Sequence, residues 1–161
     1  MNRTLLRDDI VGQFIKTVWV TPLIGHPMQE EYPGFPFPFY YTDFGYVELK
    51  TGAVFQIFNH ELDLTLPPIP IVECRDKMFS IDGIHEWKNA DMCQNKRIVD
   101  IQVSDLILSF SLFLENHKIL CNTDNFADTY ATSLIDICSK EDYDRYEFTD
   151  FWKQTPALYP Y

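Results

Sequence analysis

Three apolar stretches that follow one another between residues 98 and 123 constrain the fold of this chain more than any other feature. The first is Ile98–Val103, and in the second, Leu106–Leu114, the large apolar side chains at even positions share one face. The third, Ile119–Thr123, follows a polar turn at Glu115–Lys118. Because alternation with a period of two is typical of half-buried strands, and short polar turns join antiparallel neighbours, this region predicts an antiparallel sheet.

The first half of the chain contains a similar order of segments. Ile15–Thr21 is rich in β-branched and aromatic residues, and Tyr46–Phe58 alternates on both sides of a tight-turn sequence at residues 50–52. We therefore expect a strand followed by a hairpin in this half as well.

These two halves resemble each other as an internal repeat. Ile15–Val20 leading to residues 47–55 matches Ile98–Val103 leading to residues 112–120, with a strand, a connection and a hairpin in each copy. We predict that both copies contribute antiparallel strands to one sheet or one open barrel.

The remaining elements are predicted from shorter patterns. Apolar residues within Leu5–Phe14 recur at helical spacing, and the charged segment Lys140–Tyr146 follows Ser139, which is a suitable N-cap. Leu62–Leu66 alternates as a strand does, while Thr132–Cys138 fits either a strand or a helix. The sequence therefore predicts a short helix near each end of the chain.

A stretch rich in proline and aromatic residues, 22–44, interrupts the first half. Five prolines fall between residues 22 and 40, and aromatic rings alternate with proline in Phe35–Tyr41. We expect a stiff, extended loop here. With 161 residues the chain is long enough for one ordinary domain, so the predicted fold is a single α+β domain, mainly β, spanning 1–161.

The cysteine and histidine residues show no spacing that is typical of a metal site. The four cysteines include no C-x-x-C pair, and no histidine lies three or four residues from another. We expect four buried free thiols, with two disulfides or a distantly assembled metal site as the alternatives.

Sequence motifs for catalysis are missing as well. The chain has no glycine-rich phosphate loop and no G-x-S-x-G serine. His60 and Glu61 would face opposite ways on a strand, so they do not form a base and carboxylate pair. Cys121 could have His117 as a base across a turn, but it falls in a predicted buried strand, where a thiol is inert. We therefore predict a protein without catalytic residues, cofactor or metal.

Acidic residues outnumber basic residues by 24 to 13, which gives a net charge of −11. Nucleic acid is an unsuitable partner for this surface, because binding to phosphates depends on lysine and arginine. No apolar run approaches the roughly 20 residues that cross a bilayer, and the N-terminus lacks a leader pattern. We expect a cytoplasmic protein that contacts a basic protein and neither nucleic acid nor a membrane.

Two segments combine carboxylates with aromatic rings, as a binder of a basic protein would. The partner-binding residues predicted near the C-terminus are Asp142, Tyr143, Asp144, Glu147, Asp150 and Trp152. Those predicted in the proline-rich stretch are Glu30, Glu31, Phe37 and Asp43.

An acidic, β-rich chain with a strand, turn and strand at Leu112–Cys121 and an acidic aromatic segment at Tyr143–Trp152 resembles the small immunity proteins of bacterial toxin systems, including those of contact-dependent growth inhibition. The resemblance is one of type and assigns no residue. It implies a cytoplasmic protein that binds one cognate toxin domain, usually a basic nuclease, and blocks it.

We therefore predict a non-catalytic binding protein, a monomer or weak dimer, that neutralises a basic toxin domain through acidic and aromatic contacts. One alternative is a small β-barrel enzyme or ligand carrier for an apolar molecule. Another is an assembly component of a phage or a secretion apparatus.

Overall fold

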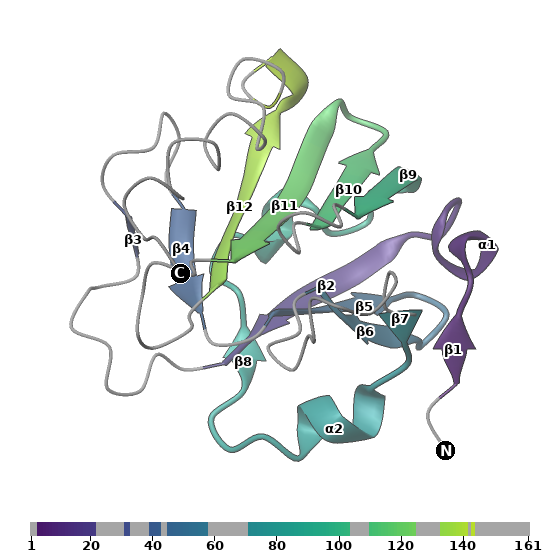
Figure 1. The fold of residues 1–161 in the computed structure, drawn as a ribbon, viewed down its shortest axis with the longest axis vertical. Coiled ribbons are helices and arrows are strands. Elements are labelled where there is room, and N and C mark those ends of the chain that lie inside the picture. The colour runs from purple at the N-terminus through teal and green to yellow at the C-terminus, as the bar shows by residue number, and fades with distance from the viewer. Residues whose placement is uncertain are drawn as a thin grey trace, which may run out of the picture.

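The computed structural model describes residues 3–21, 31–32, 39–42, 45–57, 71–103, 110–124, 133–141 and 143. Over these residues the chain is mainly strand, with antiparallel pairing throughout and only short helices (Figure 1). This confirms the prediction of a mainly β fold built on antiparallel sheet. Over the described residues the two larger sheets are open, and neither closes into a barrel.

A four-stranded sheet contains the predicted first strand and hairpin. Its strands, in spatial order, are β6 (Val54–Gln56), β5 (Gly45–Leu49), β2 (Ile15–Val20) and β8 (His85–Glu86). The turn between β5 and β6 is the one that the sequence predicts.

A six-stranded sheet contains the second half of the repeat and two strands from the proline-rich stretch. Its spatial order is β3 (Glu31–Tyr32), β4 (Phe39–Thr42), β12 (Ser133–Ser139), β11 (Lys118–Asp124), β10 (Phe110–Leu114) and β9 (Ile98–Val103). The segment that fitted either a strand or a helix is therefore the strand β12.

The shorter elements flank these sheets. They are the strand pair β1 (Thr4–Leu5) and β7 (Ile71–Val72), the helices α1 (Arg7–Ile10) and α2 (Arg75–Phe79), and the 3₁₀ turn η1 (Ala90–Met92). Helical backbone also occurs at residues 140, 141 and 143, after β12, where the sequence predicts a helix.

The two copies of the repeat start in matching registers. Ile15 of β2 pairs with Leu49, and Ile98 of β9 pairs with Leu114. An irregularity in the ladder lies beside each of these pairs, and in both copies the pairing then resumes toward the other end of the strand. The two first strands therefore have the same bulge at the same place.

The two hairpins match residue by residue. Val47 pairs with Phe55 in the first, and Leu112 pairs with Leu120 in the second, which is the alignment that the sequence predicts. After each hairpin the chain returns along the outer strand, because Glu73 bridges to Phe55 and Ile137 pairs with Leu120. A short helix follows in both copies, so the repeat extends beyond the predicted hairpins.

The prediction that both copies share one sheet is wrong. Their first strands meet only where they begin, through the bridge between Phe14 and Arg97 and the bonds from Ile15 N to Lys96 O and from Ile98 N to Gln13 O. Farther along β2 the same edge is taken by β8, and β9 therefore cannot continue along it. Each copy is built into its own sheet for this reason.

Three further expectations need correction. The stretch 22–44 contains β3 and β4, because Phe39–Thr42 has no proline and pairs with β12. The helix predicted over Leu5–Phe14 is limited to Arg7–Ile10, since Gly12 has a left-handed φ of 88°. The strand predicted over Leu62–Leu66 lies outside the described residues.

One core joins the two large sheets. It includes Val18, Val47 and Phe55 from the four-stranded sheet and Ile98, Leu112 and Leu120 from the six-stranded sheet. The other face of β5 is also buried, because Tyr46 packs with Cys74 and Met78 of the α2 segment. Figure 1 shows α2 below the four-stranded sheet, on the side away from the six-stranded sheet.

The two hairpin turns offer a test of the repeat. Gly52 and His117 both have left-handed backbone, with φ of 93° and 59°. We expect Gly52→Ala to lower the free energy of unfolding by about 1 kcal/mol, because L residues are strained in this conformation. His117→Gly relieves the same kind of strain in the second turn. It should raise the free energy of unfolding by about 0.5 kcal/mol, once the entropy cost of glycine is subtracted.

Urea unfolding followed by circular dichroism measures both changes. A clash does not complicate the result at Gly52, since an added Cβ would lie 3.9 Å from the nearest atom, on the Arg75 guanidinium. Equal destabilisation by the two substitutions would contradict the equivalence of the turns.

Candidate functional site

Only two of the predicted partner-binding residues, Glu31 and Tyr143, are among the described residues. The others lie outside them: Glu30, Phe37, Asp43, Asp142, Asp144, Glu147, Asp150 and Trp152. The structure therefore places Glu31 and Tyr143, and the partner contacts of both segments stay predictions.

Tyr143 lies against the six-stranded sheet. Its hydroxyl is 3.2 Å from Ser111 Oγ, and its ring meets the Phe113 ring edge to face at 5.5 Å between centroids. Both partners belong to β10, so this tyrosine holds the helical turn after β12 against a strand two places away. The ring is half-buried and therefore contributes part of its surface to packing.

Glu31 lies on β3, the outer strand of the same sheet. β3 pairs with β4, and β4 pairs with the first residues of β12, from Ser133 to Ile135. Glu31 is level with Ile135, because both residues pair with Tyr40, whereas Tyr143 comes after Ser139, the last residue of β12. Glu31 and Tyr143 therefore both lie at the six-stranded sheet, at different levels along β12.

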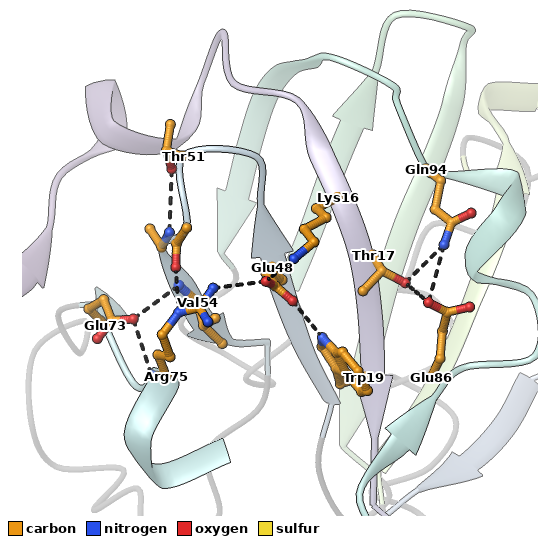
Figure 2. Close-up of polar contacts among 12 residues, drawn as sticks. Lys16, Thr17, Trp19, Glu48, Thr51, Val54, Glu73, Arg75, Glu86 and Gln94 are labelled. Atoms are coloured by element: carbon orange, nitrogen blue, oxygen red, sulfur yellow. Dashed lines mark hydrogen bonds and ion pairs between the residues drawn. The ribbon is translucent and has the colours of Figure 1, made fainter. Parts of the chain in front are cut away.

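A buried carboxylate that the sequence analysis did not single out forms the centre of the largest described polar cluster (Figure 2). Glu48, on β5, is 1% exposed. Its Oε1 accepts hydrogen bonds from Lys16 Nζ and Arg75 Nη2, each at 2.8 Å, and its Oε2 accepts one from Trp19 Nε1 at 2.9 Å. Three separate elements, β2, β5 and the start of α2, are tied together at this carboxylate.

Arg75 connects this cluster to the hairpin turn. Its Nε donates to Gly52 O at 2.8 Å, and its guanidinium lies 5.4 Å from the centroid of the Phe79 ring. Glu73 accepts the backbone N–H groups of Arg75 and Val54, both at 3.1 Å. These contacts dock α2 on the first hairpin.

The environment of Glu48 keeps its carboxylate ionised. Burial alone would raise its pKa, but hydrogen bonds from Lys16 and Trp19 and the positive charges of Lys16 and Arg75 lower the pKa below its usual value. Both oxygens already accept hydrogen bonds from three donors. This carboxylate is therefore suited to joining elements and poorly suited to exchanging a proton with a substrate.

The lowered pKa predicts acid sensitivity. A carboxyl whose pKa is lower in the folded chain stabilises it above the unfolded pKa, near 4.5, and loses that contribution as pH falls through the folded value. We expect the stability difference between the parent chain and Glu48→Gln to shrink between pH 5 and pH 3. Urea midpoints measured across this range test the prediction, and a difference that stays constant would contradict it.

A second polar cluster ties β8 and the η1 region to β2. The Thr17 hydroxyl donates to Glu86 Oε2 at 2.7 Å, and Gln94 Nε2 donates to Thr17 Oγ1 at 3.1 Å and to Glu86 Oε2 at 3.3 Å. Thr17 is buried, while Glu86 is exposed. This cluster too links elements of the fold.

One signal for the Glu48 cluster was present in the sequence. In the alignment of the two hairpins, Glu48 corresponds to Phe113, so a charged residue stands where the other copy has an aromatic one. The alternation of Tyr46–Phe58 predicted a half-buried strand with its polar side chains in water. The structure buries both faces of β5 instead, because α2 covers the second one.

Two of the described cysteines, Cys74 and Cys93, are poor nucleophiles. All four cysteines are buried free thiols, as predicted. Burial raises the pKa of Cys74 to about 11 and that of Cys93 to about 12. Neutral thiols are weak nucleophiles, so neither cysteine is a candidate for covalent catalysis.

The described ranges contain no group of three histidine, cysteine or acidic residues that could hold a metal ion. His85 is exposed, and its Nδ1 lies 3.0 Å from Gly83 O. His60 and Glu61, the pair considered in the sequence, lie outside these ranges.

Within the described residues, none of the helices has the length and apolar character needed to cross a membrane. Comparison with known proteins adds no relative: no protein-family model, curated protein or solved structure matches this chain.

Proposed function

We propose that this chain is a non-catalytic binding protein of the immunity-protein kind, which neutralises a cognate basic toxin domain through acidic and aromatic contacts. The observation that carries the proposal is the net charge of −11 on a chain that folds around a shared apolar core. Such a charge on a folded body attracts a basic partner over distances of about a Debye length, roughly 8 Å at physiological salt.

The described ion pairs support this proposal, because they do not offset the acidic excess. Arg3 pairs with Asp9, Arg7 with Asp100, and Arg97 with Glu115. In the remaining cluster Lys16 and Arg75 share the single carboxylate Glu48. Within the described residues these contacts engage five basic and four acidic residues, so they leave the acidic net charge of the chain in place.

The two polar clusters described above have a structural role, which leaves the exposed charges for contact with a partner. Within the Glu48 cluster, and separately within the Thr17 cluster, the polar groups bond to one another and hold elements of the fold together. The predicted partner contacts instead involve exposed charge, which acts on the rate of association, and aromatic anchors, which act on the rate of dissociation.

The decisive experiment uses the tagged full chain and the product of the adjacent upstream reading frame. Capture of one basic domain at near-equal stoichiometry, with association at least 10-fold slower in 0.5 M salt than in 0.05 M salt, is the expected result. Recovery of the chain alone or as a homo-oligomer would overturn the proposal, as would association whose rate does not respond to salt.

Matched charge reversals then assign the surface. Asp142→Lys with Asp144→Lys is expected to slow association about 10-fold or more. The control, Asp8→Lys with Asp82→Lys, makes the same change in net charge at two exposed positions elsewhere and should have a clearly smaller effect. Equal slowing by both pairs would show that net charge alone, and no acidic segment, guides the partner.

A further inference from the structure

Two of the four cysteines lie in contact on neighbouring strands. Cys121 of β11 and Cys138 of β12 place their sulfur atoms 3.9 Å apart. Cys121 is paired with Asp136 and Cys138 with Ile119, so the two cysteines are diagonal neighbours on the same face of the sheet. Both side chains are buried, with 1% and 3% of their surface exposed.

The other two cysteines have different surroundings. Cys74 Sγ lies 3.7 Å from Val54 O, and Cys93 Sγ lies 3.2 Å from Ala90 O. In the alignment of the two copies, Cys74 corresponds to Cys138, while the place of Cys121 is taken by Gln56. The second copy of the repeat therefore has a thiol pair where the first copy has a thiol and an amide.

We propose that Cys121 and Cys138 form a redox-sensitive pair, which closes to a disulfide by exchange with a low-molecular-weight disulfide. A bonded pair needs sulfur atoms about 2.05 Å apart, so each side chain must rotate toward the other from its position in the reduced chain. The strands are already paired on both sides of this point, from Lys118 to Asp124 on β11, and the backbone holds the two thiols side by side.

The exchange balances in two steps. The thiolate of one cysteine attacks the small disulfide, which forms a mixed disulfide and releases one small thiolate. The thiolate of the second cysteine then attacks the protein sulfur of that mixed disulfide and releases the second small thiolate. The two protons that the cysteines lose pass through solvent to the two small thiolates, so the cysteines are oxidised and the small disulfide is reduced to two thiols.

Burial determines how fast this reaction runs. Both sulfur atoms are covered in the folded sheet, so the small disulfide reaches them only when β11 and β12 separate locally. The reaction should therefore be slow under native conditions and faster at urea concentrations below the unfolding transition. The finished bond joins two cysteines that are 17 residues apart in sequence, and this restricts the unfolded chain.

The test uses the full chain incubated with glutathione disulfide, followed by blocking of free thiols, intact mass measurement and peptide mapping. The expected product has lost two hydrogen atoms, retains two free thiols and contains a Cys121–Cys138 link. Its thermal unfolding midpoint should lie about 5 °C or more above that of the reduced chain.

Matched variants identify the pair. Cys121→Ala or Cys138→Ala should stop at the mixed disulfide, whereas the double variant Cys74→Ala, Cys93→Ala should close as the parent chain does. Four free thiols after incubation in sub-denaturing urea would overturn the proposal, and so would a link through Cys74 or Cys93. Mapping of the parent chain gives this answer even where a variant fails to fold.

Discussion

Replacement of Glu48 by alanine is expected to lower the free energy of unfolding by about 3 kcal/mol. The substitution removes the acceptor of three hydrogen bonds, and it leaves Lys16 and Arg75 as neighbouring positive charges without the carboxylate between them. It also leaves the Trp19 N–H without this partner. The loss should fall at the lower end of the range for broken buried pairs, because the Lys16 and Arg75 side chains are 59% and 37% exposed and can turn toward water.

Urea unfolding at neutral pH measures this loss, with Glu115→Ala as the matched control. Glu115 pairs with Arg97 at 3.5 Å, and both side chains are at least one-third exposed. Removal of that surface pair should cost less than about 1 kcal/mol. If the two substitutions had equal effects, Glu48 would contribute no more than a surface carboxylate, and the cluster would not hold β2, β5 and α2 together.

Replacement of Phe55 by alanine is expected to cost about 3 to 5 kcal/mol. Phe55 is fully buried in the core that both large sheets share. It pairs with Val47 on one side and bridges to Glu73 on the other, so its backbone is fixed by strands on both edges. The surrounding sheet therefore has little freedom to collapse into the cavity that the missing ring leaves.

The control for this prediction is Phe14→Ala, which removes the same atoms from a side chain that is 42% exposed. Its expected cost is below about 1.5 kcal/mol, because much of the ring is already in water. The milder Phe55→Leu keeps the fold measurable if the alanine variant is too unstable to purify. A core assignment for Phe55 would be contradicted if the Phe14 variant lost as much stability as the Phe55 variant.

Several parts of this fold followed from local patterns. The hairpins at 47–55 and 112–120, and the strands before them, were predicted at the places where the structure has them. Alternation and a short turn are properties of a few consecutive residues, and they specify which residues face each other. The prediction of four buried free thiols followed from the spacing of the cysteines, which includes no C-x-x-C pair.

The functional prediction rests on charge and composition rather than on local patterns. Glu31 lies on β3 of the six-stranded sheet, and Tyr143 contacts Ser111 and Phe113 of β10. Charge and composition indicate the class of partner, because long-range attraction depends on the sum of charges. They do not indicate which acidic segment makes contact, since this depends on how the chain presents those residues in space.

By itself the sequence determined that this chain is built from a repeated strand and hairpin with antiparallel pairing, because those features depend on residues that are close along the chain. Only the tertiary structure decided that the copies form two sheets, since β8 occupies the edge of β2 that β9 would otherwise extend along. It also decided that Glu48 is buried, because α2 covers a face of β5 that local alternation leaves in water. Contacts between residues far apart in sequence determine burial and sheet partners, and alternation within a single strand carries no information about them.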